Sequence, residues 1–247
     1  MLNTPLRSCT IRASRPGIVD MWNAGMVDGA VFSSGNDIPF CPSTATEIPR
    51  ALIGYDEAKT IHNQNMRCGN RDYHVDAFIH FYIDDQKFDG KRSSIWIYPD
   101  RALEIIRHFS GIIAPDFSTN ADFPDSLKRW NTYRMCAFGY WIGEQGIQVY
   151  SNARWGTEET WSYCFDGNPH HSAIAIGTVA SGIHLLKNRS LFENGLYRMI
   201  EVLAPHTILI YGSSGYPCFD DLRARGIRIV SYPSRTSIAF EGRKQHE

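Results

Sequence analysis

AFIHFYIDD, residues 77–85, is an apolar run that ends in two aspartates, Asp84 and Asp85. Aromatic and β-branched side chains fill most of the run, and a single histidine interrupts it. A short run of this kind is typical of a strand that is buried on both faces. The stretch therefore predicts a buried strand, 77–83, with acidic side chains at its carboxyl end.

Five further short apolar runs follow along the chain: 111–114 (GIIA), 147–150 (IQVY), 172–176 (SAIAI), 207–211 (TILIY) and 227–230 (IRIV). Helical spacing of apolar residues lies between them, at 101–109, 126–143, 191–203 and 219–225. A repeated order of strand, helix and strand favours parallel strands joined by right-handed crossovers. The fold class is therefore expected to be α/β with a mainly parallel sheet.

Two weaker strand candidates, 30–33 (AVFS) and 51–55 (ALIGY), decide between two architectures. With both, the chain has about eight βα units, which fits a (β/α)8-like barrel at a typical length of about 250 residues. Without them, six strands fit an open doubly wound three-layer sandwich. The barrel is slightly favoured. We expect a single domain over 1–247, with an irregular or wrapping segment at 1–75 and a βα core at 76–235.

Composition excludes several classes of protein. Lys plus Arg number 25 and Asp plus Glu number 26, so the net charge of −1 excludes a protein that coats nucleic acid through bulk charge. No apolar stretch is long enough to span a membrane, and the start of the chain lacks the apolar core of a secretory signal. The six cysteines form no C-x-x-C pair, so no zinc site is indicated and a cytoplasmic location is expected.

Polar side chains follow nearly every predicted strand, where ligands bind in both architectures. Asp116 directly follows an apolar run, and partial burial there raises the pKa of a carboxyl toward general acid–base use. Asp84 and Asp85 are further candidates for catalysis. Adjacent residues of a strand point to opposite faces, so at most one of the two is expected to face the pocket. Each of these aspartates has a competing interpretation as a helix cap or a solvated loop residue.

Eight other residues are candidates for ligand binding: Ser118, Arg134, Asn152, Arg154, Trp155, Thr178, Gly212 and Ser213. The two arginines suit a phosphate, and Trp155 suits stacking on a base or sugar ring. A structural ion pair for Arg134 and core packing for Trp155 are the alternatives. The loop Gly212–Gly215 has the small residues of a phosphate cradle but lacks the Walker lysine.

The sequence contains no recognisable motif for a metal or a cofactor. The histidines have no H-x-x-x-H or H-E-x-x-H spacing, so no metal ligands are assigned. Carboxylates on different strands can hold Mg²⁺ without forming a motif, so magnesium stays open and the cofactor is unknown.

The strings FYIDD at 81–85, APDFS at 114–118, NTYR at 131–134, NARW at 152–155, AIGT at 175–178 and YG at 211–212 resemble an uncharacterised family from phages, plasmids and other mobile elements. That family is known only as a domain of unknown function. The similarity covers about residues 77–233; Tyr150-Ser151 departs from the Ile-Pro expected there. The resemblance implies a phage or mobile-element protein in the cytoplasm of a bacterial host, and supplies no reaction.

Two functions follow from these observations. The first is an enzyme that acts on a nucleotide, nucleoside or nucleic-acid base by carboxylate acid–base chemistry, through hydrolysis or glycosidic exchange. The second is a non-catalytic accessory factor that binds nucleic acid, a nucleotide or a host protein during replication or evasion of host defence. A cluster of basic residues after Leu222 is the sequence feature that favours the second.

Overall fold

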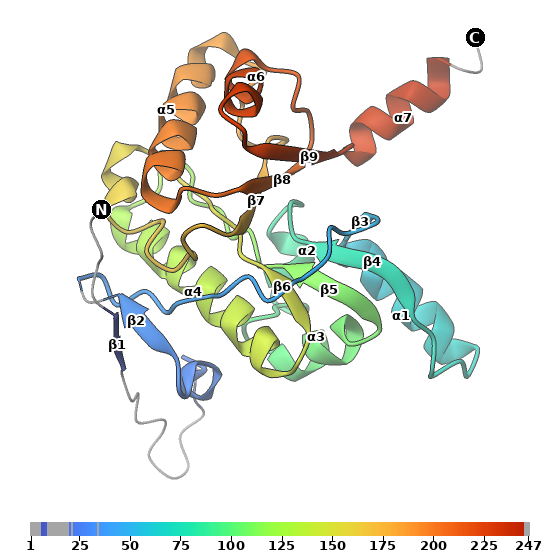
Figure 1. Cartoon of the computed structure of the whole chain (residues 1–247). Coiled ribbons are helices and arrows are strands. Elements are labelled where there is room, and N and C mark those ends of the chain that lie inside the picture. Colours follow the sequence, from blue (N-terminus) through green and yellow to red (C-terminus); the bar gives the residue numbers. More distant parts are fainter. Residues whose placement is uncertain (1–5, 9–19, 21, 34, 245–247) are drawn as a thin grey trace.

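Parallel strands form the centre of the molecule in the computed structural model, which describes residues 6–8, 20, 22–33 and 35–244 (Figure 1). Within these residues, one parallel sheet has the order β3-β4-β5-β6 and a second has the order β7-β8-β9. The strands are β3 (Leu52–Gly54), β4 (Val75–His80), β5 (Phe109–Ile113), β6 (Gln148–Tyr150), β7 (Ala173–Gly177), β8 (Thr207–Tyr211) and β9 (Arg228–Tyr232). The α/β class with parallel strands is confirmed.

Helices connect the strands and cover the outer faces of the two sheets. The first group is α1 (Tyr55–Arg67), α2 (Gln86–Asp89), α3 (Pro99–Ile106) and α4 (Asp125–Glu144); the second is α5 (Leu186–Leu203) and α6 (Pro217–Ala224). Figure 1 shows the strands between α1, α3 and α4 on one side and α5 and α6 on the other. Ile79 and Ile112 pack against the first group, and Ile208 against the second.

The inner faces of the two sheets meet in one shared cluster. Phe78, Ile113 and Tyr150 of the first sheet pack with Leu209 and Tyr211 of the second. Alternate residues of a strand point to opposite faces, so each strand supplies one set of side chains to the helices and the other to this interior. All these residues are buried, because both faces of the sheets are covered.

The two sheets curl around that interior. They are joined by an isolated parallel bridge between Asn152 and Ala175. The His80 ring at the end of β4 lies 3.9 Å, centroid to centroid, from the Tyr211 ring at the end of β8. Strands that stand far apart in the order of the sheets therefore contact each other through their side chains, as they do in a barrel.

The favoured eight-stranded closed barrel is not confirmed. In the described part of the chain, β9 and β3 stand at the two edges of the order and do not pair with each other. Tyr232 instead donates a hydrogen bond to the carbonyl of Pro49, at 2.6 Å. Strand β3 has only three residues, so little backbone is free to pair there.

The amino-terminal part of the chain is more ordered than the expected irregular segment 1–75. It contains η1 (Ala24–Val27), an antiparallel pair of β1 (Leu6–Ser8) and β2 (Val31–Ser33), β3 and the thirteen-residue helix α1. Helix α1 escaped prediction because its buried face is only Tyr55, Ala58 and His62. Ala30–Ser33 therefore corresponds to a strand that pairs outside the parallel sheets.

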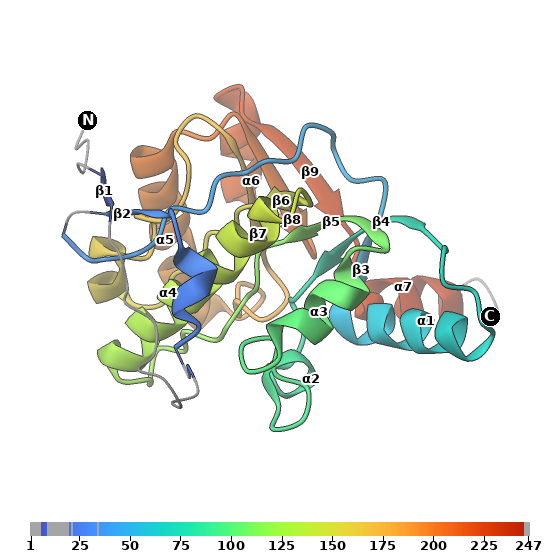
Figure 2. The same cartoon turned by 90° about the horizontal axis from the view of Figure 1, so that it is seen from below.

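The wrapping role is present in the segment between β2 and β3. Ser43 donates to the carbonyl of Ala173, and the backbone N–H of Ala45 donates to the carbonyl of Val149. Figure 2 shows this chain running from β2 across the body of the molecule to β3. The segment thus ties the first sheet to the second. The expectation of a single domain over 1–247 stays a prediction.

The expected helices and strands agree with the structure to within a few residues at each end. The main shift is at 77–83, where β4 ends at His80 and the chain turns before Asp84. The structure also adds η2 (Glu158–Ser162) and α7 (Arg235–Lys244), which the pattern of apolar residues did not indicate. The early end of β4 matters for the site, because it releases Tyr82 and both aspartates from strand geometry.

The shared interior predicts a large effect of truncation at Leu209. Leu209→Ala removes buried methyl groups between the two sheets and should lower the free energy of unfolding by about 2–5 kcal/mol, measured by urea denaturation. Leu127→Ala, on the exposed side of α4, is the control and should change it by less than about 0.5 kcal/mol. Equal effects of the two variants would contradict the shared interior.

Candidate functional site

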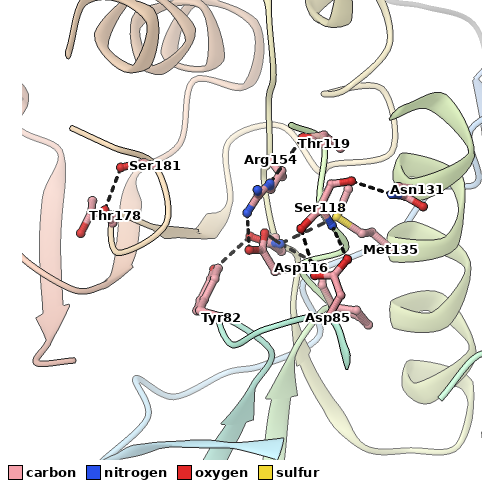
Figure 3. Close-up of polar contacts among 12 residues, drawn as sticks. Tyr82, Asp85, Asp116, Ser118, Thr119, Asn131, Met135, Arg154, Thr178 and Ser181 are labelled. Carbon is pink, nitrogen blue, oxygen red and sulfur yellow. Dashed lines mark hydrogen bonds and ion pairs between the residues drawn. The ribbon is translucent and has the colours of Figure 1, made fainter. Parts of the chain in front are cut away.

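Asp116 lies at the centre of a polar network built by three neighbouring strands of the first sheet (Figure 3). It follows β5, Asn152 and Arg154 follow β6, and Tyr82 follows β4. The carboxyl ends of parallel strands share one edge of a sheet, so these side chains meet although they are far apart in the sequence. This convergence was the central expectation for the site, and the structure brings three of the predicted residues together.

The carboxylate of Asp116 has a partner on each oxygen. Oδ2 is paired with the guanidinium of Arg154, and Oδ1 accepts a hydrogen bond of 3.0 Å from Nδ2 of Asn152. Arg154 also donates from Nε to the hydroxyl of Thr119, at 3.3 Å. The Asp116 side chain is only 7% exposed, so the ion pair is shielded from water on most sides.

Asn152 is held in one orientation by its own neighbours. Its amide oxygen accepts a hydrogen bond of 2.9 Å from the Tyr82 hydroxyl, and its amide nitrogen donates to the carbonyl of Pro115 and to Asp116. The Tyr82 ring lies against Gly177, where a Cβ atom would come within 2.6 Å of ring carbon Cδ1. A glycine at the end of β7 thus makes room for the ring that fixes Asn152.

Burial and pairing act on the pKa of Asp116 in opposite directions. Desolvation raises the pKa, while the charge of Arg154 and the hydrogen bond from Asn152 lower it; desolvation prevails, so the pKa is raised above its ordinary value. Burial also raises the pKa of Tyr82 well above its usual range, which keeps this side chain a phenol and a hydrogen-bond donor. A carboxyl with a raised pKa can carry a proton at pH values where an ordinary aspartate cannot.

Two hollows meet at the Asp116–Arg154 pair, and both residues line each of them. The first hollow has a volume of about 220 Å³ and an apolar wall of Ala153, Trp155, Ile176, Leu191 and Phe192. The second has a volume of about 580 Å³ and a polar wall that includes Tyr82, Asp84, Asp85, Lys87 and Ser118. A buried ionisable group with a perturbed pKa that lines a hollow is a candidate for a functional site.

Asp85 has a structural role in addition to its place in the second hollow. Its two oxygens accept hydrogen bonds from the backbone N–H and the hydroxyl of Ser118, at 3.1 and 3.0 Å, and so clamp the loop after β5 to the loop after β4. Asp84 is exposed at the rim of the same hollow. The expectation that at most one of them faces the pocket was wrong, because β4 ends before them and strand alternation does not apply.

Arg134 is not part of the site. Its guanidinium pairs with Asp89 at 2.7 Å, donates to Asn131 at 2.6 Å, and lies 3.9 Å from the centre of the Phe117 ring. These contacts bind α4 to the end of α2 and to the loop after β5. The alternative of a structural ion pair, rather than a phosphate-binding residue, therefore describes its contacts.

Trp155 combines the two roles that the sequence left open. Its ring packs against Phe192 at 5.1 Å between centroids, and it belongs to the core beneath α5. One side of the ring still lines the first hollow. Phe192 itself, on α5, was missed, because a phenylalanine in a helix carries no signal that separates a pocket wall from a core position.

Thr178, Gly212 and Ser213 lie in a third hollow of about 480 Å³, beside the carboxyl ends of β7, β8 and β9. Thr178 donates to the carbonyl of Ser213 at 3.0 Å, and Gly212 has a φ of 116°, which favours glycine. Figure 3 shows Thr178 and Ser181 apart from the network around Asp116. These three predicted residues thus form a group of their own.

The described residues contain neither a cluster of metal ligands nor a membrane-spanning helix. Within them there is no group of three or more His, Cys, Asp or Glu side chains that could hold a metal ion. No helix in the described ranges is long and apolar enough to cross a membrane.

The fold and the site define an α/β protein with parallel strands and a polar network at their carboxyl ends. The chain belongs to a family described as a domain of unknown function (DUF4417), whose model matches residues 33–233. It is similar to the Gene 1 protein of Mycobacterium phage D29, with 30% identity over 92% of this chain and 77% of that protein.

A second relative is the Gene 1 protein of Mycobacterium phage L5, with 30% identity over 83% of each chain. No solved structure matches this chain. The expected membership of a phage-associated family is confirmed.

The network predicts how the pKa of Asp116 responds to loss of its partner. Arg154→Gln removes a charge that lowers the pKa, so the pKa of Asp116 should rise further, as measured by a ¹³C NMR titration of its carboxyl carbon. Arg225→Gln breaks an exposed pair with Asp221 and is the control, which should leave that pKa unchanged. A fall in the pKa after Arg154→Gln would contradict the network.

The raised pKa also predicts a pH dependence of stability. A carboxyl whose pKa is higher in the folded state stabilises that state when protonated, and this contribution is lost as pH rises from its ordinary pKa of 3.8 through the folded value. The free energy of unfolding of the native chain minus that of Asp116→Asn should therefore fall as pH rises above about 4. Denaturant unfolding of both at several pH values measures this difference, and a rise would refute the assignment.

Proposed function

We propose that this protein is an enzyme that acts on a nucleotide, nucleoside or nucleic-acid base, with Asp116 as the general acid–base group. The observation that carries this proposal is the buried Asp116–Arg154 pair at the junction of two hollows. General acid–base catalysis needs a carboxyl with a raised pKa within reach of the substrate. Asp116 has such a pKa and lines both hollows.

The size and the aromatic lining of the first hollow suit a ring-shaped ligand. A dry cavity of about 150 Å³ is large enough to hold benzene, so about 220 Å³ beside Trp155 and Phe192 has room for a ring. Aromatic side chains stack on bases of any sequence, because every base has a π face. A base in the first hollow would lie beside Asp116 and Arg154, which line its polar end.

Hydrolysis of a glycosidic bond is the reaction that this arrangement suits best. As the bond between the sugar carbon and the base breaks, the base leaves with the proton of Asp116. Water then adds its oxygen to the sugar carbon and returns one proton to the Asp116 carboxylate. Arg154 stabilises that carboxylate during the interval, and Asn152 holds it in place through its hydrogen bond.

The alternative of a non-catalytic nucleic-acid-binding factor has less support in the geometry. It depended on the basic cluster after Leu222, but Arg223 pairs with Asp220, Arg225 with Asp221, and Arg235 with Asp56 and Glu57. The side chains of Arg243 and Lys244 lie outside the described residues. Paired arginines release fewer counterions on binding phosphates, so these three arginines do not favour nucleic acid. Arg228 is exposed and has no ion pair with a described residue.

The proposed place of action is the cytoplasm of a bacterial host, as the phage family implies. A host protein as partner remains a hypothesis that no contact in the described residues favours. Magnesium likewise remains open; Asp116 is already occupied by Arg154 and Asn152.

The proposal is tested by incubating the protein with a panel of nucleosides, nucleotides and short oligonucleotides and identifying products by liquid chromatography and mass spectrometry. Asp116→Asn should lower the rate of product formation by about 10²- to 10⁴-fold, because the amide cannot transfer the proton. Asp220→Asn, on the exposed face of α6, is the matched control and should keep the native rate. A native rate in folded Asp116→Asn, or no product from any member of the panel, would refute the proposal.

A further inference from the structure

The charges around the two hollows decide whether a phosphorylated or an unphosphorylated ligand is favoured there. Lys87 and Arg154 are the cationic side chains among the described residues that line the hollows, and three aspartates, Asp84, Asp85 and Asp116, line the second. The question is whether either cation is free to hold a phosphate, which carries a charge of about −1.5 to −2 at neutral pH.

Both cations already have carboxylate partners. Arg154 is paired with Asp116 inside the site. The ammonium of Lys87 lies 3.2 Å from the carboxylate of Asp56, which does not line either hollow and also binds Arg235. The hydrogen bond to Arg235 and the pairing with Lys87 hold the pKa of Asp56 well below its usual range, so this carboxylate stays charged and keeps both partners.

Arg134, the remaining arginine that the sequence assigned to phosphate binding, is paired with Asp89 beneath the loops. The third hollow offers no replacement, since its described lining consists of small and hydroxyl side chains with His184 and without lysine or arginine. A phosphate placed beside Asp116 would therefore face Asp84 and Asp85 and would have to break an existing ion pair to gain a cation.

The neutral polar groups of the first hollow suit an uncharged ligand. Asn188 and Ser181 line this hollow together with Asn120. The side-chain amide of Asn188 has no hydrogen-bond partner within the described part of the chain. An amide in that state can both donate to and accept from sugar hydroxyls or the edge of a base.

We propose that the site takes a neutral nucleoside or free base and discriminates against the phosphorylated forms. This inference rests on the proposed function and narrows its substrate class. Attraction comes from Trp155, Phe192 and the neutral amides of the first hollow. Discrimination comes from Asp84 and Asp85 of the second hollow, since the charge of Asp116 is already paired with Arg154. Specificity of this kind uses a repulsive element against the competitor as well as contacts to the preferred ligand.

The test is isothermal titration calorimetry of the full chain with adenosine, guanosine, cytidine and uridine, with their free bases and with their 5′-monophosphates. At least one nucleoside should bind, and its monophosphate should bind at least about tenfold more weakly. The ratio should shrink as salt concentration rises, because salt screens the repulsion. A monophosphate that binds as tightly as its nucleoside overturns this inference and leaves the enzyme proposal standing. No binding by any of these ligands also overturns this inference, and the enzyme proposal is then decided by the product assay with oligonucleotides.

A charge reversal at the rim of the second hollow tests whether the monophosphate is disfavoured by charge or by lack of space. Asp84→Lys should lower the ratio of nucleoside to monophosphate affinity severalfold, since the exposed rim of the second hollow then attracts the phosphate. Asp72→Lys, also exposed but at the amino end of β4, makes the same change of charge and should leave the ratio unchanged. Equal ratios for the two variants would overturn the electrostatic discrimination.

Discussion

The buried pair of Asp116 and Arg154 is the interaction around which the rest of the site is arranged. A carboxylate that is 7% exposed has lost most of its hydration, and an ion pair alone rarely repays that cost. The pair is completed by Asn152 on one side and Thr119 on the other, and Asn152 is in turn fixed by Tyr82. The three loops that follow β4, β5 and β6 must therefore keep their positions for one carboxyl to stay in place.

Those positions depend on the curl of the two parallel sheets. The ring of Tyr211, on β8, stacks on Tyr82 at 5.6 Å and 9° and contacts His80. Burial lowers the pKa of His80 to about 3, so this ring stays neutral inside the aromatic contact. The interior and the site are thus continuous: the side chains that close the interior at the end of β4 also hold the hydrogen-bond network of Asp116.

Much of this arrangement could be predicted from single segments. Run 207–211 corresponds to β8, and the runs that precede Asp116 and Asn152 correspond to β5 and β6, because buried parallel strands need continuous apolar residues. Helix α1, the partner of Arg134 and the role of Asp85 could not be predicted this way. Each depends on a partner remote in sequence: His62 is buried against other elements, Arg134 pairs with Asp89, and Asp85 accepts from Ser118.

The sequence by itself determined the α/β class, the parallel strands and the set of polar residues at their carboxyl ends. These properties follow from local periodicity and from the geometry that all parallel sheets share. Only the tertiary structure decided which of these polar residues contact one another. The curl of the sheets brings together Tyr82, Asp116, Asn152 and Arg154. It places Thr178, Gly212 and Ser213 in another hollow. Ion pairing and burial arise only when these side chains come together in the folded chain. The proton affinity of Asp116 and the charge of its surroundings are therefore decided by the fold.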